Sequence, residues 1–415
     1  MLRHRCPQVI GVLLVLSLIS TLLGSCAPGE RQEINFVFMR TSDNTEPYWQ
    51  GVIHDFEVEN PNIKVNLFIF EWADGQKKIR EMIAQGNPPT LARVATRWVP
   101  EYMAAGLLEP VDNYITPEFR AQFNSVLITE GAQYEGLTFG LPMTVTTRAL
   151  FYNKTLFKQA GITSPPQNWD ELREAAQAID NLGADTYGFG IQGKGVDTST
   201  YFYYFLLGNG GSILTADGTR PAFNSPEGRE ALNFMNDLIA KGMTQPNLTE
   251  SERGDLHNLF MQGKLGMVIS LPTLVKVLAE QAPDLDYGLS NIPYQTTPFT
   301  FAAQDTLILF KQAQNKDAAW KFIKFLYQDE YRLKYALTES ILPEKISVAN
   351  NPQFKENRSL AFFMERLPEG QFEPLNVRSA SIADTIVSYL QAVYRGEMTP
   401  DEALDEAAIQ VQRIL

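Results

Sequence analysis

The stretch from Glu33 to Phe70 constrains the fold most, because it reads as a strand, a helix and a second strand. Apolar residues alternate from Glu33 to Met39, recur at helical spacing from Tyr48 to Phe56, and alternate again from Ile63 to Phe70. A βαβ unit of this kind requires two parallel strands and a right-handed crossover. The chain must therefore begin its fold with a parallel sheet.

The same pattern continues with a helix over Gly75–Gln85, a strand over Leu91–Ala95 and a helix over Val99–Ala104. Strands that alternate with helices predict an α/β fold with a wound parallel sheet. Much later, the spacing predicts another strand over Thr306–Phe310 and one long helix over Asp317–Ala336. Since 415 residues exceed what one ordinary core supports, two domains are expected.

The N-terminus has the pattern of a secretory signal peptide over residues 1–25. A basic start, Arg3 to Arg5, precedes the apolar run Val9–Leu23, and small residues follow just before Cys26. The alternative, a transmembrane anchor, needs about 20 apolar residues. We therefore expect lipidation at Cys26 and a short tether over residues 26–32, which leaves no thiol for a disulfide because the only other cysteine is Cys6.

The composition argues against several classes of function. A net charge of −13 disfavours nucleic acid or an anionic membrane surface as the partner. None of the three histidines is paired at metal-ligand spacing, so neither a metal nor a cofactor is expected. The G-x-G-x-x-G match from Gly188 to Gly193 lacks a following helix start at Lys194–Asp197 and lies far from the first βαβ unit, which favours a glycine-rich strand and turn. A paired-carboxylate hydrolase stays open at this point.

The segment Gly140–Ile179 combines several local signals in a defined order. A Gly-Leu-Pro crossing leads into an apolar strand over Val145–Tyr152, and a short helix over Asn153–Ala160 stops at Gly161. Asn168 then caps another helix, with Glu171 three residues later as its capping-box partner.

This order resembles the bacterial family 1 extracellular solute-binding proteins, the sugar-binding components of ABC importers. Further segments resemble the family in sequence order: Phe56–Val65, Met103–Asp112, the helix opening at Ser225-Pro226, Phe260–Ile269, Ala319–Leu326 and Ile341–Pro343. The resemblance implies a type II periplasmic-binding-protein-like fold, with two wound α/β domains joined by a hinge and a ligand cleft between them. It places residues 33–141 plus 301–341 in the first domain and residues 142–300 plus 342–415 in the second.

The resemblance also implies a function without chemistry on the ligand. We expect an exported, lipid-anchored, monomeric receptor that closes on a small solute, a mono- or oligosaccharide, and delivers it to the permease subunits of an ABC importer. The alternatives are an exported carbohydrate-active enzyme, or the same fold carrying a polyamine, a glycerophosphodiester or a peptide. The family commonly has Gly-x-Trp after one strand, where this chain has Ser270-Leu271-Pro272-Thr273, so the solute itself stays open.

Sugar sites combine aromatic platforms with amide, carboxylate and guanidinium groups. Residues of these kinds at expected strand ends and crossings are Thr41, Ser42, Asp43, Glu71, Trp72, Arg97, Trp98, Thr144, Arg148, Tyr201, Tyr204, Asn209, Gln304, Asp305 and Arg378. Trp98 is the leading candidate, because it begins a helix directly after a strand. Trp49, Trp169 and Trp320 have helical-core spacing and are expected to be structural.

Overall fold

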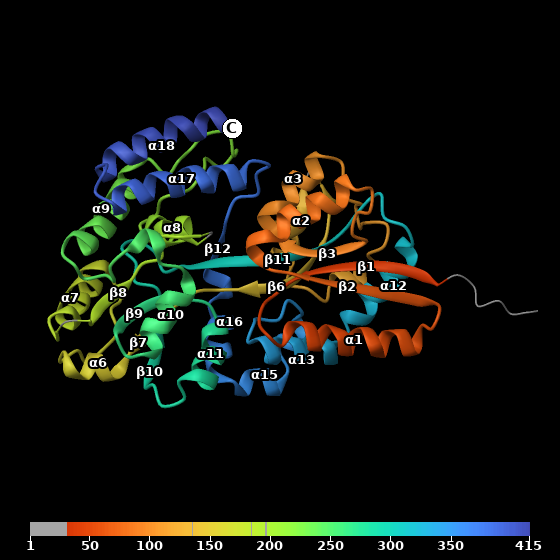
Figure 1. Ribbon diagram of the computed structural model, residues 1–415, viewed down its shortest axis with the longest axis horizontal. Helices are drawn as coiled ribbons and strands as arrows, with labels where there is room; N and C mark the ends of the chain where they lie inside the picture. Colours follow the sequence, from red (N-terminus) through yellow and green to blue (C-terminus); the bar gives the residue numbers. More distant parts are fainter. Residues whose placement is uncertain (1–30, 135, 184, 196) are drawn as a thin grey trace, which may run out of the picture.

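The computed structural model describes residues 31–134, 136–183, 185–195 and 197–415. Figure 1 shows two lobes side by side, with two strands crossing between them. The predicted signal peptide and Cys26 lie outside the described residues. Within the described part of the chain, no helix is both long enough and apolar enough to cross a membrane.

The first lobe is built on a sheet of six strands. They are β1 (Gln32–Met39), β2 (Ile63–Phe70), β3 (Leu91–Ala95), β6 (Leu141–Thr146), β11 (Thr300–Leu309) and β12 (Gly370–Phe372). Strand β1 pairs in parallel with both β2 and β3, which confirms the predicted βαβ unit. Strand β11 then runs antiparallel to β3.

Helices cover both faces of this sheet, which explains why β1 is apolar on both sides. Ile34, Phe36 and Phe38 face α1 (Thr45–Glu59), α12 (Lys316–Leu326) and α13 (Asp329–Glu339), whereas Val37 and Met39 face α2 (Trp72–Ala84) and α3 (Val99–Ala104). Trp49 and Trp320 are buried in the first of these layers, as expected. Smaller elements of this part of the chain are η1 (Thr96–Trp98), α4 (Pro117–Arg120), α5 (Ser125–Ala132), β4 (Gln133–Tyr134) and β5 (Leu137–Thr138).

The second lobe has a four-stranded sheet in the order β10-β7-β9-β8. Its strands are β7 (Ala149–Asn153), β8 (Tyr187–Gly190), β9 (Leu265–Ser270) and β10 (Tyr287–Ser290). Strands β8 and β9 are parallel, and β7 is antiparallel to its neighbours. Gly188 is required here, because a Cβ at this position would lie 2.2 Å from the carbonyl oxygen of Ala176 in α7. Glycines of the G-x-G-x-x-G match thus serve close packing, which agrees with the structural interpretation of the motif.

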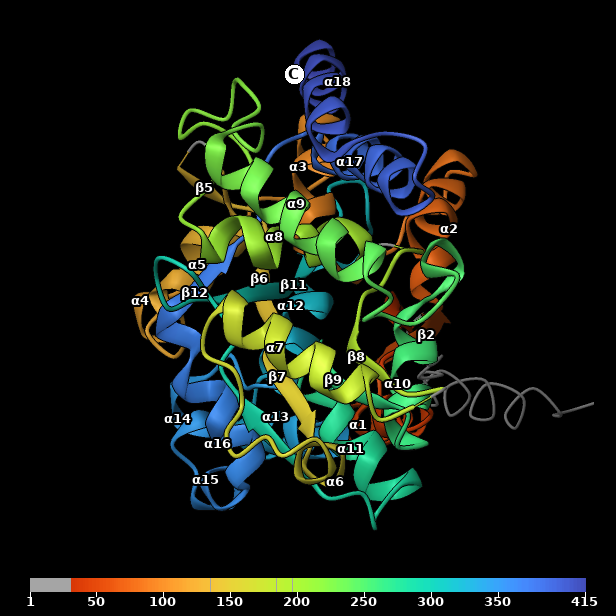
Figure 2. The same ribbon diagram turned by 90° about the vertical axis from the view of Figure 1, so that its left-hand side faces the viewer.

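Helices surround the second sheet and extend to the C-terminus (Figures 1 and 2). They are α6 (Lys154–Gln159), α7 (Trp169–Asp180), α8 (Thr198–Gly208), α9 (Pro226–Ala240), α10 (Arg253–Met261), α11 (Thr273–Gln281), α17 (Ser379–Tyr394) and α18 (Pro400–Ile414). Three local start signals are confirmed, since Asn168, Ser225 and Thr399 each accept a hydrogen bond from the backbone near the start of α7, α9 and α18. The remaining elements are η2 (Leu248–Glu250), α14 (Ile346–Ala349), α15 (Pro352–Glu356), α16 (Arg358–Glu365) and η3 (Leu367–Glu369).

Three predicted elements differ from the structure. The single strand predicted over Val145–Tyr152 is two strands, because the chain leaves the first sheet after β6 and enters the second with β7. The strand predicted over Thr306–Phe310 begins earlier, at Thr300, where pairing with β12 extends it. The helix predicted over Asp317–Ala336 is two helices, α12 and α13, with a break at Tyr327 and Gln328.

A contact from a distant segment accompanies this break. Lys345 donates a hydrogen bond of 2.7 Å from Nζ to the carbonyl oxygen of Tyr327, and it also pairs with Asp329 in the first turn of α13. The Tyr327 carbonyl is therefore occupied by a side chain rather than by a helical N–H. Sequence periodicity contains no signal for such a contact.

The segment after α13 is tied to the crossing strands by a buried ion pair. Arg332 of α13 donates to both carboxylate oxygens of Glu344, at 2.7 and 3.0 Å, and both side chains are only 1% exposed. The same guanidinium donates to the carbonyl oxygen of Met143 in β6. One bidentate pair thus connects α13, β6 and the residues that follow Leu342, which itself bridges to Val145.

We predict that Glu344→Gln lowers the free energy of unfolding by about 3–5 kcal/mol, because it leaves a charged guanidinium in the interior without its counter-charge. Urea unfolding followed by circular dichroism measures the loss. The matched control is Glu397→Gln, which breaks the exposed pair between Arg395 and Glu397 and is expected to have a much smaller effect, because solvent screens exposed pairs. Equal effects of the two substitutions would contradict this assignment.

Candidate functional site

The ends of the parallel strands in the first lobe carry several of the predicted ligand residues. Thr41 and Ser42 follow β1, Glu71 and Trp72 follow β2, and Arg97 follows β3. Open α/β sheets bind ligands outside the carboxyl ends of their strands. This edge of the first sheet is therefore one wall of the candidate site.

A buried polar network lies behind this wall and includes three of the predicted residues. Arg93, which is 3% exposed, pairs with Asp305 of β11 and donates at 2.9 Å to Thr41 Oγ1. Thr144 of β6 donates at 2.6 Å to the same Asp305 carboxylate. The side chains of Thr144 and Asp305 are thus bonded to the protein itself, and they connect the crossing strands to the strand ends.

Aromatic residues of the first wall differ in exposure. Trp98 is 7% exposed and packs in a core cluster with Val37 and Met39. The residue that the sequence favoured most for ligand binding is therefore largely buried. Trp72 packs against it, with ring centroids 5.8 Å apart, and is half-buried. The guanidinium of Arg93 lies 5.2 Å from the Trp72 ring. Among the five tryptophans, Trp72 alone is not buried.

The other predicted residues of the first wall are less enclosed. Arg97 lies within 3.8 Å of Glu373 from the second half of the chain. Glu71 accepts a hydrogen bond of 2.6 Å from Arg40, and Asp43 is exposed. Arg378 is exposed at the start of α17, a helix that contacts η1.

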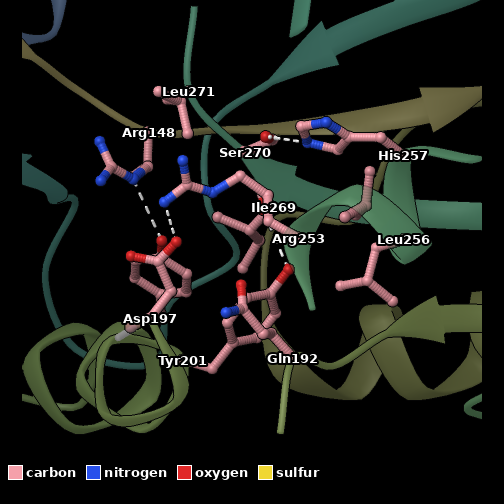
Figure 3. A pocket seen from close by; sticks show the side chains of 12 residues that line it. Arg148, Gln192, Asp197, Tyr201, Arg253, Leu256, His257, Ile269, Ser270 and Leu271 are labelled. Atoms are coloured by element: carbon pink, nitrogen blue, oxygen red, sulfur yellow. Dashed lines mark hydrogen bonds and ion pairs between the residues drawn. The ribbon is translucent and has the colours of Figure 1, made fainter. Parts of the chain in front are cut away.

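The second wall is a small pocket at the corresponding edge of the second sheet (Figure 3). Three predicted residues line it, namely Arg148, Tyr201 and Tyr204. Its other lining residues are Gln192, Asp197, Arg253, Leu256, His257, Val268, Ile269, Ser270 and Leu271. Most come from the ends of β8 and β9 and from the first turns of α8 and α10, so the local geometry repeats that of the first lobe.

Arg148 is held in this pocket by the strand that crosses between the lobes. The Thr300 hydroxyl accepts a hydrogen bond of 2.8 Å from the Arg148 backbone N–H and donates one of 2.9 Å to its carbonyl. The Arg148 side chain donates through Nε to Tyr204 at 3.2 Å and through Nη1 to Thr146 at 2.8 Å. Burial raises the pKa of Tyr204, so its phenol stays neutral and its own hydrogen can be donated to a ligand.

Gln192 supplies a polar atom of the opposite kind. Its amide nitrogen donates at 2.6 Å to the carbonyl of Lys194, whereas its buried Oε1 atom has no partner within the described part of the chain. Buried polar atoms are rarely left unpaired. Together, Tyr204 and Gln192 offer a donor and an acceptor to a polar solute.

Charged and titratable groups complete the pocket. Arg253 pairs with Asp197, and Figure 3 shows the side chains of Arg148 and Arg253 extending into the same space. His257 Nε2 lies 2.9 Å from Ser270 Oγ. Burial, and then the positive charge of Arg253, lower the pKa of His257 to about 3, so this histidine is neutral.

Two predicted residues do not lie with the others. Asn209 is at the C-terminal end of α8, whereas the pocket lies at its N-terminal end, and its amide donates to Glu230 at 2.8 Å. Gln304 points to the far side of β11 and packs against Gly131 of α5, where an added Cβ would lie 1.8 Å from Nε2. Both are polar residues beside a crossing or a helix end, a pattern that does not reveal which way the side chain faces.

Sequence reasoning missed Arg93, Gln192, Asp197 and Arg253. Gln192 follows the rule used for the others, since it comes just after β8, whereas Arg93 lies in the middle of β3 and does not. Asp197 and Arg253 lie at helix starts 56 residues apart, and only the packing of α8 and α10 onto one sheet edge brings them together. No group of acidic, histidine or cysteine side chains within the described residues is arranged to hold a metal ion.

Two α/β lobes joined by crossing strands, with polar strand ends facing one another, define a two-lobed binding protein. Comparison with known proteins places the chain more narrowly. The model of the bacterial extracellular solute-binding protein family matches residues 42–332, and the chain belongs to this family. A binding protein of Brucella abortus is 37% identical over 397 residues, which cover 95% of this chain and 96% of the relative.

Two further relatives have known ligands. The maltotriose-binding protein of Pyrococcus abyssi is 23% identical, over 80% of this chain and 71% of that protein. The crystal structure of an ABC transporter solute-binding protein from Thermotoga lettingae, bound with α-D-tagatose, superposes with a TM-score of 0.84 at 28% identity and covers 92% of this chain and 99% of that one. These findings confirm the predicted family and the type II fold. They also favour a binding protein over the paired-carboxylate hydrolase, because the family and its neighbours are solute-binding proteins.

We predict that His257 makes the stability of the protein fall in mild acid. Its pKa is about 3 in the folded state and about 6.5 when unfolded, so the unfolded chain binds the extra proton. This contribution to stability is complete above pH 6.5 and is lost progressively as the pH falls toward 3. Between pH 8 and pH 5 the loss is about 2 kcal/mol.

Urea unfolding of the wild type and of His257→Gln at both pH values measures this contribution. The variant is expected to lose about 2 kcal/mol less than the wild type between pH 8 and pH 5, whatever its stability at pH 8. Carboxylates contribute equally to both proteins and therefore cancel in the difference. An identical pH dependence of the two proteins would show that His257 titrates normally.

Proposed function

We propose that this protein captures a saccharide between its two lobes and delivers it to the permease of an ABC importer. The observation that carries the proposal is the pocket at the ends of β8 and β9, where Tyr204 and Gln192 offer an unused donor and acceptor. Sugar hydroxyl groups both donate and accept hydrogen bonds, so they match such a pair. The ligands of the Pyrococcus and Thermotoga relatives, maltotriose and α-D-tagatose, support the same class of solute.

We further propose that binding proceeds by hinge closure. In this proposal residues 33–141 plus 301–341 form one domain and residues 142–300 plus 342–415 the other, so that the three boundaries fall in or beside the crossing strands β6 and β11. A solute that contacts both walls stabilises the closed arrangement over the open one. The residues proposed to contact it first are Trp72 and Arg97 on one wall and Arg148, Tyr201 and Tyr204 on the other.

We predict that Trp72→Ala weakens saccharide binding about tenfold, or about 1.4 kcal/mol, because it removes the one tryptophan ring that is not enclosed in the core. Titration calorimetry over a panel of mono- and oligosaccharides identifies the tightest ligand of the wild type and measures the change. The control is Val58→Ala on an exposed face of α1, where the side chain is 68% exposed and binding should not change.

Tryptophan fluorescence gives an independent reading of the same variant. A ligand-dependent change is expected in the wild type and should be much smaller in Trp72→Ala, since the other four tryptophans are buried. Absence of binding by every saccharide up to millimolar concentration would refute the saccharide ligand. Unchanged affinity in Trp72→Ala would instead remove Trp72 from the site.

Attachment of the receptor to the membrane by a lipid on Cys26 is also proposed. The support is the sequence pattern of a basic start, an apolar run and small residues before this cysteine. We predict that the full chain partitions with membranes after expression in a bacterial host and that Cys26→Ala moves it to the soluble exported fraction. Immunoblotting of the fractions checks this, with Cys6→Ala as the control that should not change the distribution.

A further inference from the structure

The candidate site contains more positive than negative charge. Arg148 and Arg253 line the same pocket, and the charge of Arg97 on the first wall also acts on Arg253. Two acidic side chains oppose them: Asp197, paired with Arg253, and Glu373, which lies 3.8 Å from Arg97. Arg148 has no acidic side chain within ion-pair distance among the described residues.

Arg148 is a buried charged side chain whose hydrogen-bond partners among the described residues are all neutral. It is 6% exposed, and its hydrogen-bond acceptors in the described part of the chain are neutral: the Tyr204 phenol, the Thr146 hydroxyl and the Thr147 carbonyl. A buried charge is costly unless it is paired. These bonds use Nε and Nη1, so that Nη2 remains for a ligand in a pocket that Arg148 lines.

The acidic groups nearby do not neutralise this charge. Asp197 is engaged by Arg253, which also donates the hydrogen bond between them. Burial raises the pKa of Glu373 and the positive charge of Arg97, which lies 3.8 Å away, opposes that rise, so Glu373 is engaged by Arg97 rather than by Arg148.

The wall that carries these arginines also lacks an indole platform. No tryptophan is among the described residues that line this pocket, and the residue directly after β9 is Leu271. An aliphatic side chain cannot stack a sugar ring as an indole does. Binding energy at this wall must therefore come mainly from polar and charged contacts.

We propose that the saccharide carries an anionic group, a carboxylate or a phosphate, which is bound by Arg148 and Arg253. This inference rests on the proposed saccharide function and narrows its ligand class. A guanidinium group offers carboxylate or phosphate several directed N–H donors, which a lysine ammonium cannot reproduce, and here Nη2 of Arg148 and the guanidinium of Arg253 would share one anion. Tyr204 would donate to the same anion, and the free oxygen of Gln192 would accept from a neighbouring hydroxyl of the sugar, a contact that a bare anion cannot make.

Titration calorimetry with matched ligands tests the proposal. The probes are glucose, glucuronate and glucose 6-phosphate, the galactose equivalents of these three, and citrate and inorganic phosphate as anions without a sugar ring. We expect an acidic sugar to bind at least about tenfold more tightly than its neutral counterpart, and to weaken as the salt concentration rises. Preference for the uronate or for the phosphate identifies which anion the site takes.

Arginine variants show whether the named residues are responsible. Arg148→Gln should reduce the preference for the acidic sugar to about threefold or less. Arg253→Gln should reduce the preference for the acidic sugar as well. Because Arg253 is more exposed, this variant replaces Arg148→Gln in the test if Arg148→Gln does not fold. Arg148→Lys keeps the positive charge but loses the directed N–H donors of the guanidinium. Its preference for the acidic sugar should therefore lie between those of the wild type and Arg148→Gln. Arg173→Gln, on the outer side of α7, is the control and should leave the preference unchanged.

Each contrary result has a separate meaning. A neutral sugar that binds as tightly as its acidic counterpart would overturn the anionic ligand while leaving the saccharide function intact. A preference that survives both Arg148→Gln and Arg253→Gln would overturn the assignment of the anion to these two arginines. If citrate or phosphate binds while every sugar probe fails to bind, the saccharide function is overturned and the pocket is an anion site. Absence of binding by every probe would overturn both.

Discussion

Strand β11 is the element on which the arrangement of both lobes depends. It pairs with β12 at its start, with β3 at its end and with β6 along its other edge. Its first residues also hold the second lobe, because Thr300 bonds to both backbone groups of Arg148 and Phe301 packs against Tyr203 and Tyr204. A strand with these partners transmits any change at one lobe to the other.

The polar groups along this strand explain how the crossing strands are held in one defined arrangement. Asp305 binds Arg93 and Thr144, and Arg93 in turn binds Thr41 at the first wall. Satisfied buried networks favour one arrangement over its alternatives, because each partner that moves leaves another unpaired. The bulge between Asp305 and Thr306 interrupts the register at the same place.

Much of the fold could be predicted from the sequence, since its signals are local. The alternation in β1 and β2 and the caps at Asn168 and Thr399 depend on residues within one or two turns, and the structure agrees with them. Contacts between distant residues decide the rest. The break at Tyr327 accompanies a bond from Lys345, and the burial of Trp98 follows from packing against Trp72 and the first sheet. Neither can be read from spacing along the chain.

The candidate site was predictable to the extent that topology determines it. Parallel strands end at a common edge, so polar residues after β1, β2 and β3 could be assigned to one wall from the sequence. Arg148 could be assigned to a crossing, but its lack of an acidic partner could not, because Asp197 and Arg253 approach it only through the packing of α8 and α10. In a low-dielectric pocket, the combined charge of Arg148, Arg253 and Asp197 affects ligand binding more than the charge of any one of them. Among the described residues, no tryptophan lines the second wall, where Leu271 lies with the guanidinium groups of Arg148 and Arg253, so the proposed recognition there uses charge and hydrogen bonds rather than stacking.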